Sequence, residues 1–477
     1  MTNTHPITPI MYKMMPWIAA MAFFMQMLDS SILNTALPAI ARDLDESPLN
    51  MQSAVICYAL ALALFIPVSG FLSDRFGTRN IFIFSVFLFS CGSLFCALSP
   101  SLLILDISRI IQGIGGAMMV PVSRLVLIKS FKRSEFLAAL NASTIPGLVG
   151  PVVGPLLGGY FVQYISWHWI FLINLPIGLL GIVAGWKYMP NIKGKNSFFD
   201  TSGVILIALA VVCATLAIEL INQNMKIQFS IGLFAVCSIS LILYFKHAKK
   251  SPSPIFPLIL FKIHTFKIGI IGNLISRLGI SAAPFLVPLL LQVAFGYSAL
   301  YAGLMLMPMA VASFLGKSLV QPVLRHYGYR RVLITNTTLI GLVIIAMVSL
   351  ERDSSIILFG LLLFCLGATN SLQFTAMNSI TLADLPNDLT SSGNSLMAVN
   401  QQLAISFGIA CGAVLVRIFS NLDEVTDHNI TMAFKITFVV LGIFTCLSGL
   451  IFRQLYPEDG RNLISQSNSD SSTVRSK

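Results

Sequence analysis

Two side chains of opposite charge lie inside apolar stretches, and their chemistry is the clearest functional signal in the sequence. Asp29 lies within the stretch at 15–37, and Arg109 lies within another at 102–126. A charged side chain inside a bilayer is costly, so each is a functional candidate by default. Together they could form a proton carrier, in which the carboxylate gains and loses a proton beside the arginine. The alternative is a static buried ion pair.

The stretches that carry these residues predict a polytopic membrane protein. The chain has 477 residues, of which 56% are hydrophobic and 10% charged, whereas a soluble domain carries roughly 25% charged residues. Apolar runs of about 20 residues, enough to cross a ~30 Å hydrocarbon core, recur along the chain. We predict an all-α fold of about fourteen transmembrane helices, at 15–37, 52–73, 81–98, 102–126, 137–162, 169–189, 201–220, 228–246, 267–292, 302–324, 331–350, 356–382, 393–418 and 432–453. This excludes cytosolic binding modules and disulfide scaffolds.

The expected depths of Asp29 and Arg109 in the bilayer indicate that the two charged side chains lie at the same level. Asp29 lies about 14 residues into the first helix, roughly 20 Å from the inner face. Arg109 lies about 8 residues into the fourth helix, which runs inward, and so roughly 12 Å from the outer face. In a ~30 Å core these depths nearly coincide. We therefore expect Asp29 and Arg109 to meet.

The distribution of basic residues predicts the topology. The net charge is +11, from 30 Lys and Arg against 19 Asp and Glu. Most of the basic residues fall in loops on one side of the predicted helices and in the two tails. This bias follows the positive-inside rule and places both termini in the cytoplasm. The expected partner of the surface is therefore the lipid bilayer, and no nucleic-acid partner is expected.

Two similar turns suggest an internal duplication. Residues 76–81 and 327–332 are both basic turns with a glycine between two predicted helices. The sequence therefore predicts two six-helix bundles with two inserted helices. The expected parts are a cytoplasmic tail at 1–13, the N-terminal bundle at 14–190, the inserted helices with flanking loops at 191–265, the C-terminal bundle at 266–455, and a disordered cytoplasmic tail at 456–477.

Two glycine-containing motifs are candidates for conformational change. In the fifth helix a stripe of small residues allows close packing of another backbone, and prolines bend the helix; its residues are Gly150, Gly154, Pro155, Gly158 and Gly159. At the inner end of the second helix, a charged run could hold neighbouring helix ends together; its residues are Gly70, Asp74, Arg75, Gly77 and Arg79. The alternative for the stripe is tight static packing, and the alternative for the charged run is an ordinary basic loop.

The motifs together resemble the fourteen-helix drug:proton antiporter family of the major facilitator superfamily. The run from Leu28 to Pro38 resembles the helix 1 motif of that family, and Arg109 to Ala117 resembles the helix 4 motif whose arginine is associated with proton transfer. Residues 70–79 resemble the loop 2–3 motif, 150–159 the antiporter motif, and 167–176 the helix 5–6 corner. The second basic turn, at 327–332, departs from the loop 2–3 motif, because Arg325 stands where Asp74 would fall.

The resemblance implies a major facilitator fold and a proton-coupled exporter of small organic molecules, located in the bacterial inner membrane and functional as a monomer. Gly316-Lys317-Ser318 resembles the end of a phosphate loop, but Val311 replaces its first glycine, so no Walker motif is present. The expected energy source is thus the proton gradient, with Asp29 and Arg109 as its site. No cofactor, metal or catalytic residue is expected.

Polar residues inside the predicted helices are candidates for a substrate cavity, or for hydrogen bonds between helices. They are Gln26, Asn34, Gln112, Arg277, Lys317, Asn370 and Gln373. The predicted C-terminal helices contain no acid, yet Arg277 lies near the midplane, which favours an organic anion as an alternative substrate. Lys317 could instead reach the cytoplasmic surface. A passive facilitator and a non-transporting membrane sensor are further alternatives.

Overall fold

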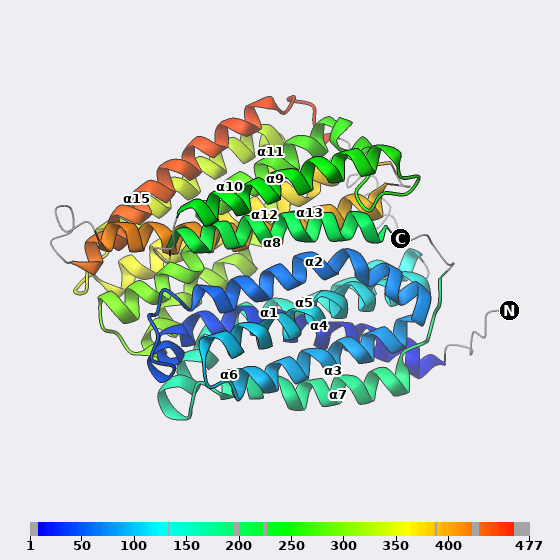
Figure 1. Cartoon of the computed structure of the whole chain (residues 1–477), viewed down its shortest axis with the longest axis horizontal. Coiled ribbons are helices and arrows are strands. Elements are labelled where there is room, and N and C mark those ends of the chain that lie inside the picture. Colours follow the sequence, from blue (N-terminus) through cyan, green and yellow to red (C-terminus); the bar gives the residue numbers. More distant parts are fainter. Residues whose placement is uncertain are drawn as a thin grey trace. The chain divides into compact units, whose positions relative to one another are not determined.

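The computed structural model describes residues 8–131, 133–194, 200–222, 227–386, 389–421 and 429–461. These ranges are almost entirely helical and contain no strand (Figure 1). The chain is therefore an all-α membrane protein, as predicted. Most of the two predicted tails, at 1–7 and 462–477, lies outside the described residues. Residues 456–461, which were expected to be disordered, are ordered, and Gly460 packs against the ring of Tyr329.

The internal contacts group the chain into two compact units. Unit 1 comprises residues 1–204 and 288–307, and unit 2 comprises residues 205–287 and 308–477. The helices of unit 1 are α1 (Pro9–Asp43), α2 (Gln52–Phe76), α3 (Thr78–Ala97), α4 (Leu102–Ser130), α5 (Arg133–Tyr164), α6 (Trp169–Leu172) and α7 (Asn174–Tyr188). Unit 1 also includes residues 288–307, which we call the 288–307 segment; it runs from the end of α10 (His264–Leu289) into the first part of α11 (Ala299–Ala346). The predicted division into six, two and six helices stays a prediction.

Unit 2 contains the remaining helices. They are α8 (Thr201–Asn222), α9 (Ile227–Lys250), η1 (Leu258–Lys262), α10 (His264–Leu289), α11 (Ala299–Ala346), η3 (Met347–Ser349), α12 (Ile356–Leu382), α13 (Thr390–Ser420), α15 (Ile430–Ser448) and η4 (Gly449–Gln454). The unit boundaries fall within α8, α10 and α11, and the π-helix η2 (Leu290–Ala294), which lies between α10 and α11, belongs to unit 1.

The long helix α11 contains two of the predicted spans. Its backbone is non-helical at Gly328, where φ is 73° and ψ is 162°. Glycine tolerates this positive φ because it has no Cβ atom. Thirteen described helices are long and apolar enough to cross a membrane, and the break at Gly328 divides α11 at the turn that separates the predicted spans 302–324 and 331–350.

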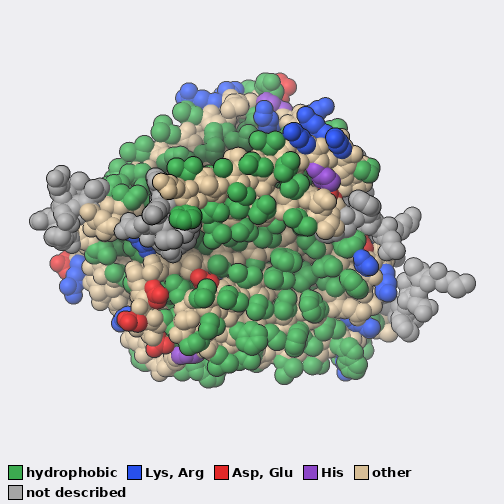
Figure 2. Space-filling view, in the orientation of Figure 1, with side chains coloured by type: hydrophobic (Ala, Val, Ile, Leu, Met, Phe, Trp, Pro, Cys, Tyr) green, Lys and Arg blue, Asp and Glu red, His purple; other side chains and the backbone are tan. Residues whose placement is uncertain are grey.

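The side chains have the distribution expected in lipid. Large residues such as Phe82, Phe89 and Met118 form the buried core of unit 1. Other large hydrophobic residues are exposed, including Trp186 at 70% and Leu179 at 63%. Figure 2 shows hydrophobic side chains over the flanks of the helices in view, and Lys and Arg side chains near the margins. A soluble protein rarely exposes apolar surface on this scale, so the exposed flanks are suited to hydrocarbon.

Candidate functional site

Asp29 on α1 and Arg109 on α4 form a direct ion pair. Arg109 Nη1 donates to Asp29 Oδ2 at 2.7 Å, and each side chain has only 1% of its surface exposed. The estimated depths of the two residues in the bilayer predicted this contact. Because water does not reach the pair, each charge depends on the other for its stabilisation, and the loss of one partner would leave the other uncompensated.

Three polar side chains complete a cluster around the carboxylate. Gln112 accepts from Arg109 Nη1 at 2.5 Å and donates to Asp29 Oδ1 at 2.7 Å. Asn174 donates to the same oxygen at 3.2 Å. Ser93 Oγ accepts from Gln112 Nε2 at 2.7 Å and from Asn174 Nδ2 at 3.2 Å. We call these five residues the Asp29 cluster. Its carboxylate joins α1, α4 and α7 directly, and Ser93 links α3 to them through Gln112 and Asn174.

The guanidinium of Arg109 also contacts α2. Its Nε donates to Ala54 O at 3.2 Å, and its Cζ lies 4.1 Å from the centre of the Tyr58 ring. A cation over an aromatic face is attracted to it, more strongly when both are desolvated. Arg109 thus has partners other than Asp29, which matters if the carboxylate becomes neutral.

Sequence reasoning missed Ser93, Tyr58 and Asn174. Asn174 lies in the run 167–176 that carried the family resemblance, so a signal was present for it. Ser93 and Tyr58 had no comparable signal, because serine and tyrosine are common in membrane helices and their depth does not specify which way they face. Gln112 was expected to line a cavity. It is instead fully buried within the Asp29 cluster.

Glycines on α3 and α4 allow the helices around the Asp29 cluster to pack closely. A Cβ atom at Gly113 would lie 2.8 Å from Tyr58 O on α2, and one at Gly92 would lie 2.5 Å from Gln112 N on α4. Neither distance is compatible with a side chain. The small residues let α2 and α3 approach the backbone of α4, and this close approach excludes water from Arg109 and Gln112.

The glycine stripe on α5 packs against the turn of α1 that carries Asp29. A Cβ atom at Gly150 would lie 2.8 Å from Leu28 N, and one at Gly158 would lie 2.6 Å from Ile32 O. Ser31 lies between them on α1 and donates to the carbonyl of Gly150 at 3.2 Å. A movement of α5 along this contact would therefore act on the same turn as the carboxylate.

The C-terminal end of the stripe meets the 288–307 segment, which belongs to the same unit. A Cβ atom at Gly159 would lie 2.5 Å from Ala299 O, and Gly303 lies directly against the carbonyl of Pro155. In addition, Gln292 in η2 donates to Thr35 O of α1 at 2.9 Å. The stripe therefore contacts two different partners, α1 along its length and the 288–307 segment at its end.

The charged run between α2 and α3 also makes specific contacts. Asp74 pairs with Lys129 at the end of α4, with 2.9 Å between Oδ1 and Nζ. Gly77 has a φ of 95°, and next to it Thr78 Oγ1 donates to Pro190 O at 2.9 Å. Arg75 is exposed, and Arg79 is half-buried. Gly70 has no atom within 4 Å of a Cβ position, so space at Gly70 is not restricted.

The other cavity candidates differ in their surroundings. Gln26 is buried, and Asn34 and Asn370 are half-buried. Gln373 is buried and bonds to Asn336 and Thr337 at 2.9 and 2.8 Å, so it joins helices within unit 2. Lys317 is exposed on α11. Within the described residues, no three His, Cys, Asp or Glu side chains gather as a metal site would require.

Arg277 on α10 is the most distinctive of the candidates in unit 2. Its side chain is half-buried, and its Cζ lies 4.8 Å from the ring centre of Phe374 on α12. It forms no ion pair within the described part of the chain. The arginine thus has an aromatic neighbour and an uncompensated charge.

Comparisons with known proteins agree on one family. The sequence model described as Major Facilitator Superfamily matches residues 19–409 and 269–474. A protein of Pectobacterium atrosepticum named "Putative multidrug resistance protein MdtD" is 43% identical over 93% of this chain and 95% of its own length. A Citrobacter koseri protein of the same name is 41% identical over 94% of this chain and 96% of its own. The fold is similar to that of a D-xylose-proton symporter, with a TM-score of 0.69, 12% identity, and coverage of 94% of this chain and 99% of that one.

Proposed function

The chain belongs to the major facilitator superfamily of membrane transporters, and from this premise we propose that it is a proton-coupled antiporter. It would export small organic molecules across the bacterial inner membrane in exchange for protons. The names of its relatives support multidrug efflux as the class of activity. The observation that carries the proton coupling is the buried ion pair between Asp29 and Arg109.

A proton on Asp29 would remove the negative charge from the Asp29 cluster. Neutral Asp29 would no longer compensate the charge of Arg109, although Gln112, Ala54 O and the Tyr58 ring would still contact the guanidinium. The link between α1 and α4 would weaken, while Arg109 would remain bound to α2 and to its own helix. Since α1 also packs on the glycine stripe of α5, α1 would gain freedom to move against both neighbours. Proton binding would thereby favour one facing state.

The test is transport driven by an imposed pH gradient in proteoliposomes. We expect Asp29→Asn to abolish gradient-driven uptake of substrate into inverted vesicles, because the carboxamide cannot carry the proton. Asp106→Asn is the matched control, since Asp106 lies on α4 and bonds to Ser53 at 2.9 Å, outside the Asp29 cluster. Undiminished uptake by the Asp29 variant would overturn the assignment. Equal loss in both variants would show that the assay reports general damage.

Arg277 favours a second candidate substrate, an organic anion. Its charge is uncompensated within the described residues, and a half-buried arginine beside an aromatic ring can bind a carboxylate through two hydrogen bonds while the ring contacts an apolar group. Screening carboxylates against dye-like cations would distinguish the two classes. Export of cations alone by the wild type, with Arg277→Ala unchanged, would leave the general drug exporter as the proposal.

A further inference from the structure

A cavity rich in arginine lies in unit 2, separate from the Asp29 cluster. Its volume is about 1010 Å³, and five arginines line it against a single carboxylate. The lining residues are Arg325, His326, Tyr327, Gly328, Arg330, Arg331, Ile334, Arg453, Pro457, Asp459 and Arg461. They come from the break in α11, from η4 and from the residues that follow η4. We propose that this cavity binds a phosphate-bearing anion.

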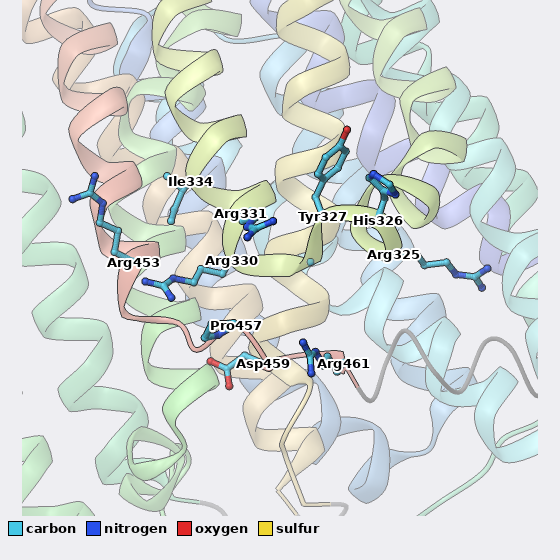
Figure 3. A pocket seen from close by; sticks show the side chains of 11 residues that line it. Arg325, His326, Tyr327, Arg330, Arg331, Ile334, Arg453, Pro457, Asp459 and Arg461 are labelled. Carbon is cyan, nitrogen blue, oxygen red and sulfur yellow. The ribbon is translucent and has the colours of Figure 1, made fainter.

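The arginines of the cavity have few partners of opposite charge. Within the described ranges, Arg330, Arg331, Arg453 and Arg461 form no ion pair. Asp459 does not neutralise them, because its Oδ2 accepts from Tyr456 N at 2.8 Å and lies 3.9 Å from His264 Nε2. Figure 3 shows Arg330 and Arg453 extending from different helices on one side of the cavity, with Asp459 and Arg461 below them.

The walls of the cavity are held by packing. Gly460 has a φ of 77° and lies against the ring of Tyr329, which is only 4% exposed. Leu455 is 1% exposed, and the ring of His264 stacks on Tyr456 with 4.5 Å between the centres. These contacts fix the chain that carries Asp459 and Arg461 against α11 beside its break at Gly328. The fold therefore brings five arginines around one cavity, where Arg330 is half-buried and the other four are exposed.

The chemistry and the surroundings of the cavity fit a phosphate group. Arginine binds phosphate through a planar pair of donors, and several convergent arginines stabilise a doubly charged or diester phosphate. Tyr327, Leu450 and Tyr456 near the cavity are exposed at 57%, 47% and 62%, which suits the boundary between headgroups and hydrocarbon. The positive-inside bias also predicts that this end faces the cytoplasm. Basic pockets at that depth are known sites for anionic lipid headgroups; a free phosphate compound has the same chemistry.

The experiment compares lipid binding by the purified full-length protein and two double variants. Native mass spectrometry would count bound phosphatidylglycerol and phosphatidylcholine. The site variant is Arg330→Gln with Arg453→Gln. The control is Lys249→Gln with Lys250→Gln, which removes the same charge from exposed positions at the end of α9 in the same unit. A second arm measures thermal stabilisation by glycerol 3-phosphate, and Arg461→Gln serves as an additional single variant.

We expect the wild type and the control to prefer phosphatidylglycerol. We expect the affinity of the site variant for this lipid to fall by roughly tenfold or more. This result assigns the cavity to a lipid headgroup. Stabilisation by glycerol 3-phosphate that is lost in the site variant, without a preference for phosphatidylglycerol, supports the site with a soluble phosphate as its source. Equal binding of both lipids and of glycerol 3-phosphate by the wild type, the site variant and Arg461→Gln overturns the proposal. None of these readouts depends on transport.

Discussion

At the scale of single residues, the cost of burying the Asp29–Arg109 pair determines what each substitution should do. Both side chains are 1% exposed, and water cannot replace a lost partner there. Removing one member of a buried pair typically costs about 3–5 kcal/mol, whereas replacing both members by apolar groups can be nearly neutral. Stability and transport should therefore respond differently to the same changes.

We expect Asp29→Ala and Arg109→Ala each to lower the melting temperature in detergent, and the double variant to be more stable than the sum of the two losses predicts. The single variants leave a buried charge uncompensated, while the double variant leaves none. Thermal unfolding of the three variants and the wild type measures the coupling. Strictly additive losses would mean that the ion pair does not exist in the protein.

Asn174 offers a test of the cluster beyond the ion pair. Asn174→Leu removes a donor to Asp29 Oδ1, and the loss of a hydrogen bond to a charged group costs roughly 1.5–3 kcal/mol. We expect gradient-driven transport to fall strongly. Gln373→Leu is the control, because Gln373 is also a buried amide but bonds to Asn336 and Thr337 in unit 2. If the Asn174 and Gln373 variants show the same rate of gradient-driven transport, Asn174 has only a structural role.

At the scale of elements, the positions of the helices followed from the sequence more completely than their contacts. Runs of apolar residues predicted the spans, and a basic turn predicted the break of α11 at Gly328. Depth along a helix also predicted that Asp29 and Arg109 could meet. The rotation of each helix about its axis is set by packing between helices, and this is why Ser93 and Tyr58 were missed and why Gln112 was assigned to a cavity.

The glycine stripe of α5 permits a prediction about movement between elements. Gly154→Leu should block exchange between facing states, because a side chain at this position would collide with Ser31; overpacking of this kind costs roughly 1–3 kcal/mol. In a background without native cysteines, the labelling of Ser30→Cys from each side of the membrane would report the exchange. Gly232→Leu is the control, since no atom lies within 4 Å of its Cβ position. Unchanged labelling in the Gly154 variant would make the stripe a purely static contact.

The pair between Asp74 and Lys129 links the ends of α2 and α4. Its side chains are 32% and 27% exposed, so its contribution to global stability should be small, about 0–1 kcal/mol. We expect Asp74→Lys to reduce transport while the melting temperature changes little. The exchange of both charges, Asp74→Lys with Lys129→Asp, should restore part of the activity. Failure of this exchange to restore any transport would show that the pair itself is not what the loop requires.

At the scale of the whole molecule, the number of spans and the distribution of charge must agree on a topology. Thirteen described helices are long and apolar enough to cross a membrane, and the non-helical backbone at Gly328 divides α11 into two. An even number of crossings places both termini on the same side. The excess of Lys and Arg on that side predicts that it is the cytoplasm.

Reporter fusions test this topology directly. We expect green fluorescent protein to fluoresce when fused at the C-terminus or after Ser251, because it folds in the cytoplasm. We expect alkaline phosphatase to be active when fused after Asp353, in the turn that follows the second half of α11. If α11 crossed the membrane only once, the fusions at Ser251 and Asp353 would lie on the same side, in the cytoplasm, and the C-terminus would lie outside. Phosphatase activity at the C-terminus would therefore contradict two crossings by α11, and it would also place the arginine cavity of unit 2 on the wrong side for the anionic lipids of the inner leaflet.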